Sequence, residues 1–132
     1  MLLDTSAFLF FLWGDARMKK ALGPAISNPA MPLKVSAASF WEMTIKHRIG
    51  KLPLPKPFST DPVDAMEQWC GRGGINLIDL APKHIGRAMG LDFKHEDPFD
   101  RVIAATAIVE GVQLVTSDKR FKSCKGLQVL LV

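Results

Sequence analysis

Four acidic residues are the side chains of this chain best suited to chemistry. Asp4, Glu42, Asp100 and Asp118 lie in four separate segments, in each of which the local pattern predicts the start of a helix. Carboxylates that converge in a fold bind hard divalent cations such as Mg²⁺ or Mn²⁺, which prefer oxygen ligands. Such a cation activates a bound water and offsets the charge that develops on a phosphodiester during hydrolysis. The pattern therefore predicts a metal site, provided that the fold brings the four acids together.

Each acid also has a structural interpretation. Asp4, Asp97 and Asp118 are suited to cap the N-terminus of a helix, a role worth about 1 kcal/mol. Asp100 would lie in a first helical turn, where the helix dipole favours negative charge. Glu42 has no cap to make, because it lies inside a helix. Two carboxylates about 5 Å apart repel by about 3 kcal/mol at an effective dielectric constant of about 20, so a cluster of four needs a counter-charge.

Composition predicts one compact domain over residues 1–132, with 48% hydrophobic and 23% charged residues and no repeats. The apolar stretch 1–13 contains Asp4, has no leading basic residue and is too short to span a bilayer, so we expect neither a signal peptide nor a membrane anchor. Cys70 and Cys124 are far apart, which argues against a zinc site or a disulfide framework and favours the reducing cytoplasm. The net charge of +4 suits a polyanionic partner.

Hydrophobic patterning predicts strands that alternate with helices. The expected strands are 1–4, 33–35, 75–80, 113–116 and 127–131. The expected helices are 5–13, 15–22, 37–49, 61–70, 82–90 and 98–110, with a helical turn at 118–121 and a proline-rich connector at 51–62. This alternation is typical of a three-layer α/β fold, with a parallel sheet of about five strands and helices on both faces.

The predicted sheet indicates where the acids should meet. Asp4 and Asp118 follow strands, and Asp100 begins the helix that leads into the second of these strands, so all three belong to the carboxyl edge of the sheet. In the helix 37–49, which Ser36 is expected to cap, Glu42 should lie at the edge of the buried stripe and look into a cleft. That stripe is predicted to consist of Ala37, Trp41, Ile45 and Ile49.

Four blocks of the chain resemble a PIN domain, in particular the VapC-like toxins of type II toxin–antitoxin modules. The blocks are LLDTSAFLF, SAASFWEMTIKHRIGKL, HEDPFDRVIAATAI and LVTSDKRF, and they cover nearly the whole chain in the family's order. The resemblance implies a three-layer PIN-like fold and a Mg²⁺-dependent (or Mn²⁺-dependent) endoribonuclease that hydrolyses RNA with a cation-activated water. It also implies a homodimer, inhibited by a small antitoxin whose carboxyl-terminal part enters the active-site groove.

Carried over residue by residue, the resemblance assigns catalysis and metal binding to the four acids Asp4, Glu42, Asp100 and Asp118. Residues that could support the site are Asp97, Ser6, Thr116 and Arg101, although Asp97 is first of all a cap and Arg101 could equally face solvent. RNA phosphates would be bound by Lys46, Arg48, Lys119 and Arg120, although Lys46 could instead pair with Glu42 one helical turn away. His47 and His95 lack partners at metal-ligand spacing and are interpreted as surface or groove residues.

Two other functions remain open at this point. A phosphatase of the haloacid dehalogenase type also has an aspartate after its first strand, but it needs a second acid two residues later, where this chain has Ser6. A non-catalytic α/β domain that binds RNA or protein would use the acids only as caps. Stabilisation by Mg²⁺ or Mn²⁺ separates this last possibility from a metal site, because isolated caps would not respond to the cation.

Overall fold

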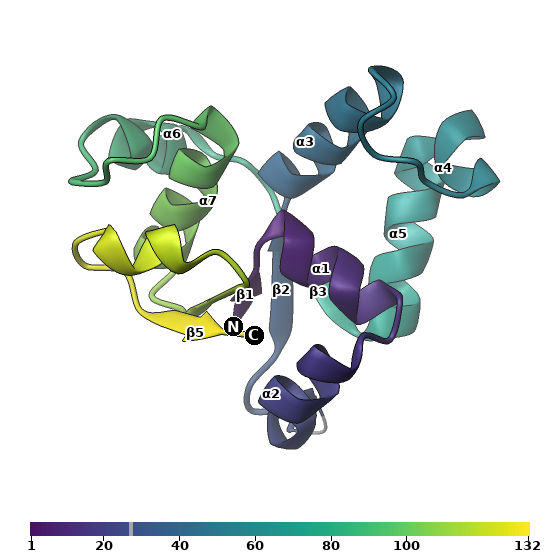
Figure 1. Ribbon diagram of the computed structural model, residues 1–132, viewed down its shortest axis with the longest axis horizontal. Helices are drawn as coiled ribbons and strands as arrows, with labels where there is room; N and C mark the ends of the chain where they lie inside the picture. The colour runs from purple at the N-terminus through teal and green to yellow at the C-terminus, as the bar shows by residue number, and fades with distance from the viewer. Residues whose placement is uncertain (27) are drawn as a thin grey trace.

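A five-stranded parallel sheet forms the middle layer of the protein (Figure 1). The computed structural model describes residues 1–26 and 28–132. The strand order is β3-β2-β1-β4-β5, and every neighbouring pair is parallel, which confirms the predicted fold class. The strands are β1 (Leu2–Leu3), β2 (Leu33–Ser36), β3 (Ile75–Ile78), β4 (Leu114–Thr116) and β5 (Val129–Leu131).

Helices cover both faces of the sheet, and the strands show why. Side chains alternate between the faces of a strand, so Leu3 and Val115 join the core under α1, α2, α4 and α5, whereas Leu2 and Leu114 join the core under α6, α7 and η1. None of the helices in the described ranges is both long and apolar enough to span a bilayer. The helices are α1 (Thr5–Leu12), α2 (Ala16–Ile26), α3 (Ala37–Arg48), α4 (Lys56–Thr60), α5 (Pro62–Gly73), α6 (Pro82–Met89), α7 (Pro98–Val109) and the 3₁₀ helix η1 (Lys119–Ser123).

Three helices depart from the prediction. The helix expected over 61–70 is α5, which continues to Gly73. The second helix does not end at Gly23 but continues to Ile26. A proline inside a helix removes one backbone hydrogen bond, and the packing of Leu22 and Ala25 against the core offsets this loss of stability. The connector 51–62 contains the short helix α4. A proline is tolerated in a first helical turn, and the burial of Phe58 holds this turn against the core.

The predicted buried stripe of α3 is wrong. Trp41 is 56% exposed, and its ring lies edge-on to that of Phe99 at a centroid separation of 5.0 Å. The face that packs inward contains Ala38, Ser39, Glu42 and Met43. The apolar periodicity predicted the wrong face because the face of α3 that packs inward contains an acid and a serine. The large apolar side chain of Trp41 instead packs over the start of α7.

Candidate metal centre

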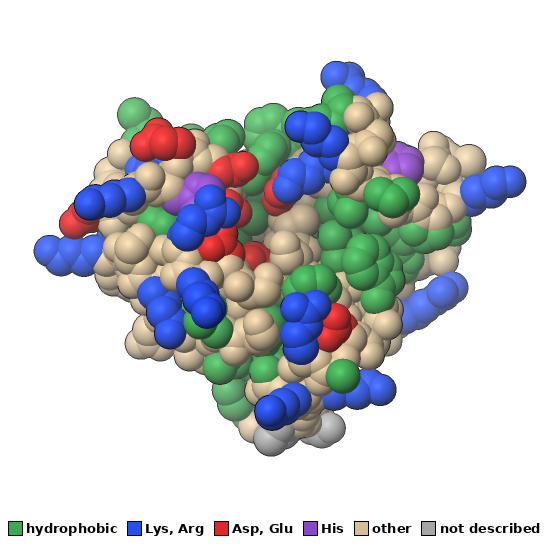
Figure 2. Space-filling view, viewed as in Figure 1, with side chains coloured by type: hydrophobic (Ala, Val, Ile, Leu, Met, Phe, Trp, Pro, Cys, Tyr) green, Lys and Arg blue, Asp and Glu red, His purple; other side chains and the backbone are tan. Residues whose placement is uncertain are grey.

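The predicted acids gather at the carboxyl edge of the sheet. Asp4 directly follows β1, Asp118 lies two residues beyond β4, Asp100 is in the first turn of α7, and Glu42 projects from α3. In the space-filling view, acidic side chains collect near the middle of the face, between α7 and α3, and Lys and Arg side chains surround them (Figure 2). Asp4 and Glu42 are each only 4% exposed.

Three aspartates act as helix caps, as predicted. Asp4 accepts a hydrogen bond from the backbone N–H of Ala7 at 2.6 Å, and Asp118 accepts one from Arg120 at 2.8 Å. Asp97 accepts from the backbone N–H of Asp100 at 3.1 Å as well as from Phe99. In each aspartate the cap uses Oδ1. Oδ2 accepts from Thr116 at Asp4 and from Arg120 at Asp118, and each of these Oδ2 atoms keeps a further lone pair for a cation. Capping and metal binding are therefore compatible at Asp4 and Asp118.

Thr116 joins two of the acids. Its hydroxyl donates a hydrogen bond to Asp4 Oδ2 and accepts one from the backbone N–H of Asp118 at 2.9 Å. Because Thr116 is fully buried at the end of β4, this hydroxyl sets the orientation of the Asp4 carboxylate.

Replacement of Thr116 by Val is expected to lower the free energy of unfolding by about 1.5 to 3 kcal/mol, the contribution of a hydrogen bond to a charged group. The matched control is Thr106→Val. The Thr106 hydroxyl is equally buried but donates only to a carbonyl of its own helix, at 2.8 Å from Val102 O. Chemical denaturation at neutral pH measures both variants, and equal losses would argue against a special role for Thr116.

Glu42 is held by two polar neighbours. The Thr5 hydroxyl donates to Glu42 Oε2, and Lys46 Nζ pairs with Glu42 Oε1. The role of Thr5 was not predicted, because the sequence marks this residue only as the start of a helix. The pairing of Lys46 with Glu42 was foreseen from their spacing of four residues. In this arrangement Lys46 supplies a counter-charge to a buried acid.

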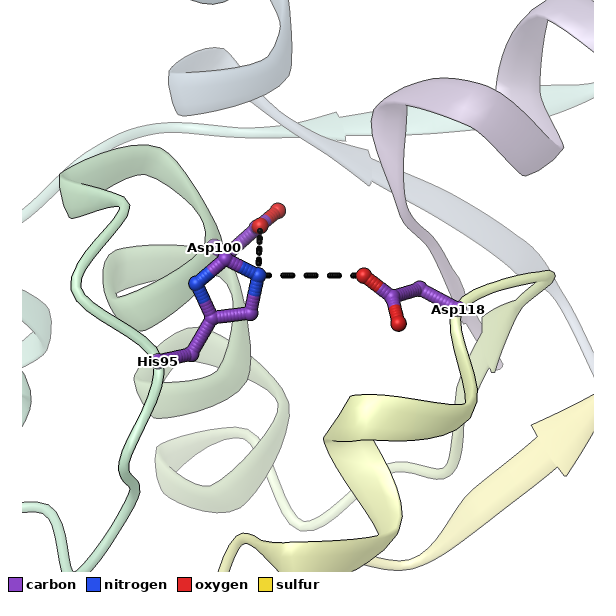
Figure 3. A group of neighbouring side chains, drawn as sticks. All are labelled: His95, Asp100 and Asp118. Carbon is purple, nitrogen blue, oxygen red and sulfur yellow. Dashed lines mark ion pairs between the residues drawn. The ribbon is translucent and has the colours of Figure 1, made fainter.

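His95 lies between Asp100 and Asp118 (Figure 3). Its Nε2 is 2.9 Å from Asp100 Oδ2 and 3.7 Å from Asp118 Oδ2, and its side chain is 9% exposed. Within the described ranges, these three residues are the group whose potential ligand atoms all lie within 4.8 Å of one another. His95 was interpreted as a surface or groove residue rather than a ligand, and it does line a pocket, together with Asp97, Lys119 and Arg120. Its contact with two of the acids was not predicted. His95 precedes Asp100 by five residues in the sequence, but this spacing does not predict a contact. The two side chains meet because the loop before α7 folds back onto the acids.

The electrostatics of the cluster favour a bound cation. Burial raises the pKa of Asp4 to about 6; hydrogen bonds from Thr116 and Ala7 oppose this rise, and repulsion from Glu42 and Asp118 adds to it. Burial also raises the pKa of Asp100 to about 7, with further repulsion from the neighbouring acids. A positive charge among these carboxylates would relieve both effects.

The basic residues divide into two groups. Arg120 is bound to Asp118, with Nε at 2.8 Å from Oδ2, and this hydrogen bond lowers the pKa of Asp118. Lys46 is paired with Glu42. Arg48 and Lys119 are exposed and form no ion pair within the described ranges.

Two of the residues proposed to support the site lie differently. Arg101 donates to backbone carbonyls, including that of Phe93 at 2.6 Å and that of Ala88 at 3.0 Å, and pairs with no carboxylate among the residues that the structure describes. This packing explains why its position next to Asp100 in the sequence was misleading. Ser6 is exposed on the first turn of α1.

The donor set fits a hard cation. Asp4, Glu42, Asp100 and Asp118 offer carboxylate oxygens, the ligand type that Mg²⁺ and Mn²⁺ prefer. Neither cysteine contributes, because Cys70 and Cys124 are both buried in hydrophobic cores.

Comparisons with known proteins agree with this architecture. The sequence model of the PIN domain family matches residues 1–127. Over 56 residues the chain is 41% identical to Ribonuclease VapC16 of Mycobacterium tuberculosis, a match that covers 42% of this chain and 38% of that protein.

Solved structures share the fold at low sequence identity. VapBC2 from Rickettsia felis, bound to a DNA fragment from its promoter, has a TM-score of 0.71 at 17% identity, covering 98% of this chain and 96% of that one. DNA-bound VapBC from Salmonella typhimurium has a TM-score of 0.67 at 18% identity, with coverages of 98% and 95%. A toxin–antitoxin complex from Klebsiella pneumoniae has a TM-score of 0.60 at 20% identity, with coverages of 98% and 94%. From its family match and its fold, the chain belongs to the PIN domain family.

Proposed function

We propose that this protein is a Mg²⁺- or Mn²⁺-dependent endoribonuclease. The observation that carries the proposal is the clustering of Asp4, Asp100 and Asp118 with Glu42, in which burial and mutual repulsion raise the pKa of Asp4 to about 6 and that of Asp100 to about 7. Repulsion of this kind is relieved by a cation, and an oxygen-rich cation site is suited to phosphodiester hydrolysis. The similarity to a ribonuclease over part of the chain supports the choice of reaction.

The four carboxylates would hold the cation, which supplies water activation and charge neutralisation at the scissile phosphate. Thr116 orients Asp4, and Thr5 orients Glu42. Once the acids are neutralised, Lys46 and Arg120 lose much of their attraction to Glu42 and Asp118. Their charged groups then become available to phosphate oxygens.

Incubation of the purified protein with total cellular RNA, with and without Mn²⁺, tests the reaction and its substrate together. We expect new RNA ends that require the cation and disappear with EDTA. Mapping these ends identifies the RNA class and the cleavage sequence. Cleavage that persists in EDTA would contradict the metal mechanism.

Exposed cations should contribute to RNA affinity through phosphate contacts. Replacement of Lys119 by Ala is expected to weaken RNA binding and to reduce the slope of log K against log salt concentration by about 0.7 to 0.9, the loss of one phosphate contact. Lys20 is a matched control, because it is exposed on α2, which lies at the opposite end of β2 from α3 and its acid (Figure 1). Filter binding of cleavage-deficient protein over a salt series measures both variants. An unchanged slope for Lys119→Ala would remove this residue from the interface.

We further propose that the protein is the toxin of a type II toxin–antitoxin module, acts in the cytoplasm and forms a homodimer. Support comes from its likeness to VapBC complexes and from an apolar groove of about 530 Å³ suited to a protein partner. The groove is lined in part by Leu12, Trp13 and Trp69. Sedimentation of the purified chain, alone and co-expressed with the product of a short adjacent reading frame, tests both partners.

A further inference from the structure

The ring of His95 has a defined tautomer. Its Nδ1 accepts a hydrogen bond from the backbone N–H of Asp97 at 3.2 Å, so Nδ1 carries no proton. In a neutral imidazole the proton then lies on Nε2. We assign His95 as an Nε2–H donor, and a nitrogen that carries a proton cannot coordinate a cation. Although His95 lies at ligand distance from two acids, its role in this arrangement differs from theirs.

The Nε2–H group is buried beside two carboxylates. Nε2 lies 2.9 Å from Asp100 Oδ2 and 3.7 Å from Asp118 Oδ2, but it makes no aligned hydrogen bond within the described ranges. A buried donor without a partner costs about 1 to 3 kcal/mol. A small rotation of either carboxylate would satisfy the donor. The position of His95 therefore favours one relative placement of Asp100 and Asp118.

Arg101 holds the loop that carries His95. Its NH1 donates to Phe93 O at 2.6 Å and to His95 O at 3.2 Å. Its NH2 donates to Ala88 O at 3.0 Å and to Leu91 O at 3.2 Å. Four carbonyls on one rigid guanidinium fix the path of the backbone into residue 95.

Aromatic packing fixes the ring of His95. The rings of Phe93 and Phe121 lie at centroid separations of 5.4 Å and 6.3 Å from it. The rings of Phe93 and Phe121 also lie 5.4 Å from each other, so the three rings form one cluster. With the ring packed against this pair and its Nδ1 engaged, the direction of the Nε2–H group is set before any ligand arrives.

We propose that His95 is a positioning residue of the metal centre, held in place by Arg101. Its Nε2–H group, 2.9 Å from Asp100 Oδ2 and 3.7 Å from Asp118 Oδ2, is placed to donate to Asp100 once that carboxylate rotates into line, and so keeps the two acids at the separation that binds the cation. The inference rests on the proposed function, because it assumes that these acids bind Mg²⁺ or Mn²⁺. It adds that a histidine N–H donor, outside the ligand set, sets the affinity of the site.

The test compares two substitutions by the affinity for Mn²⁺ alone, measured by electron paramagnetic resonance of the free ion. His95→Phe keeps an aromatic ring against Phe93 and Phe121 but has no donor, and it is expected to weaken Mn²⁺ binding by about 10- to 100-fold. His95→Gln retains an N–H donor at a similar reach and is expected to bind within about threefold of the parent. Circular dichroism checks that both variants fold.

Two measurements on the parent need no variant. Pulsed paramagnetic resonance of the Mn²⁺-loaded protein is expected to show no directly coordinated nitrogen. Nitrogen NMR of the metal-free protein is expected to show His95 with the proton on Nε2. A coordinated nitrogen, a proton on Nδ1, or parental Mn²⁺ affinity in folded His95→Phe would each overturn the role of His95 and leave the metal centre intact. A parent that binds no Mn²⁺ would instead overturn the metal centre, and the role of His95 with it.

Discussion

Asp100→Asn is expected to reduce Mn²⁺-dependent RNA cleavage by about three orders of magnitude or more. The substitution keeps the size of the side chain but removes a charged ligand, and the cation is expected to contribute several kcal/mol of transition-state stabilisation. The hydrogen bond from the Asp100 backbone N–H to Asp97 is unaffected, so the start of α7 should stay folded. Asp4→Asn is expected to act in the same direction.

Initial rates with a defined RNA, measured over a range of Mn²⁺ concentrations, provide the comparison. Asp64→Asn serves as the control, because Asp64 is an exposed acid in the first turn of α5. Circular dichroism verifies that each variant is folded. If Asp100→Asn cleaves as fast as the parent and the Asp64 control, Asp100 is not part of the catalytic site.

Metal-free protein is expected to lose stability as the pH rises from about 4 to about 7, through the contributions of Asp4 and Asp100. The pKa of each is higher in the folded chain, about 6 and about 7, than the ordinary value of 3.8. The folded state therefore binds these protons more tightly, so their stabilisation is complete below about pH 4 and is lost above the folded pKa. The shift at Asp4 corresponds to about 3 kcal/mol.

Asp100→Asn isolates this effect from the other titrating groups. The free energy of unfolding of the variant minus that of the parent should be smallest near pH 4 and should increase until about pH 8. Chemical denaturation in EDTA across this range measures the difference. A difference that stays constant with pH would contradict the raised pKa of Asp100.

Mn²⁺ should reverse the loss of stability. At a concentration about 100 times its Kd, the cation stabilises the folded state by about 2.7 kcal/mol, which raises the Tm of a domain of this size by roughly 10 °C. The increase should be larger at about pH 8 than at about pH 5, because the acids must be ionised to bind. Calorimetry with and without Mn²⁺ measures it. No response at either pH would favour the alternative of a non-catalytic binding domain that uses its acids as caps.

Local signals along the chain account for much of this molecule. Alternating strands and helices predict the parallel three-layer fold, and Ser36, Asp4, Asp97 and Asp118 cap the helices that they were expected to cap. These predictions succeed because a cap or a hydrophobic period depends on residues only a few positions apart. Parallel topology then brings Asp4 and Asp118 to one edge of the sheet, since both follow strands.

The packing of distant segments decides what surrounds these acids. The hydrogen bond from Thr116 to Asp4 joins residues 112 positions apart in the sequence, and the hydrogen bond from Thr5 to Glu42 joins residues 37 positions apart. The rotation of α3 that buries Glu42 and exposes Trp41 depends on what α1 and α7 present to that helix. His95 reaches the acids because Arg101 binds the carbonyls of the preceding loop. Such contacts form only in the folded chain, and no local period or spacing in the sequence encodes them.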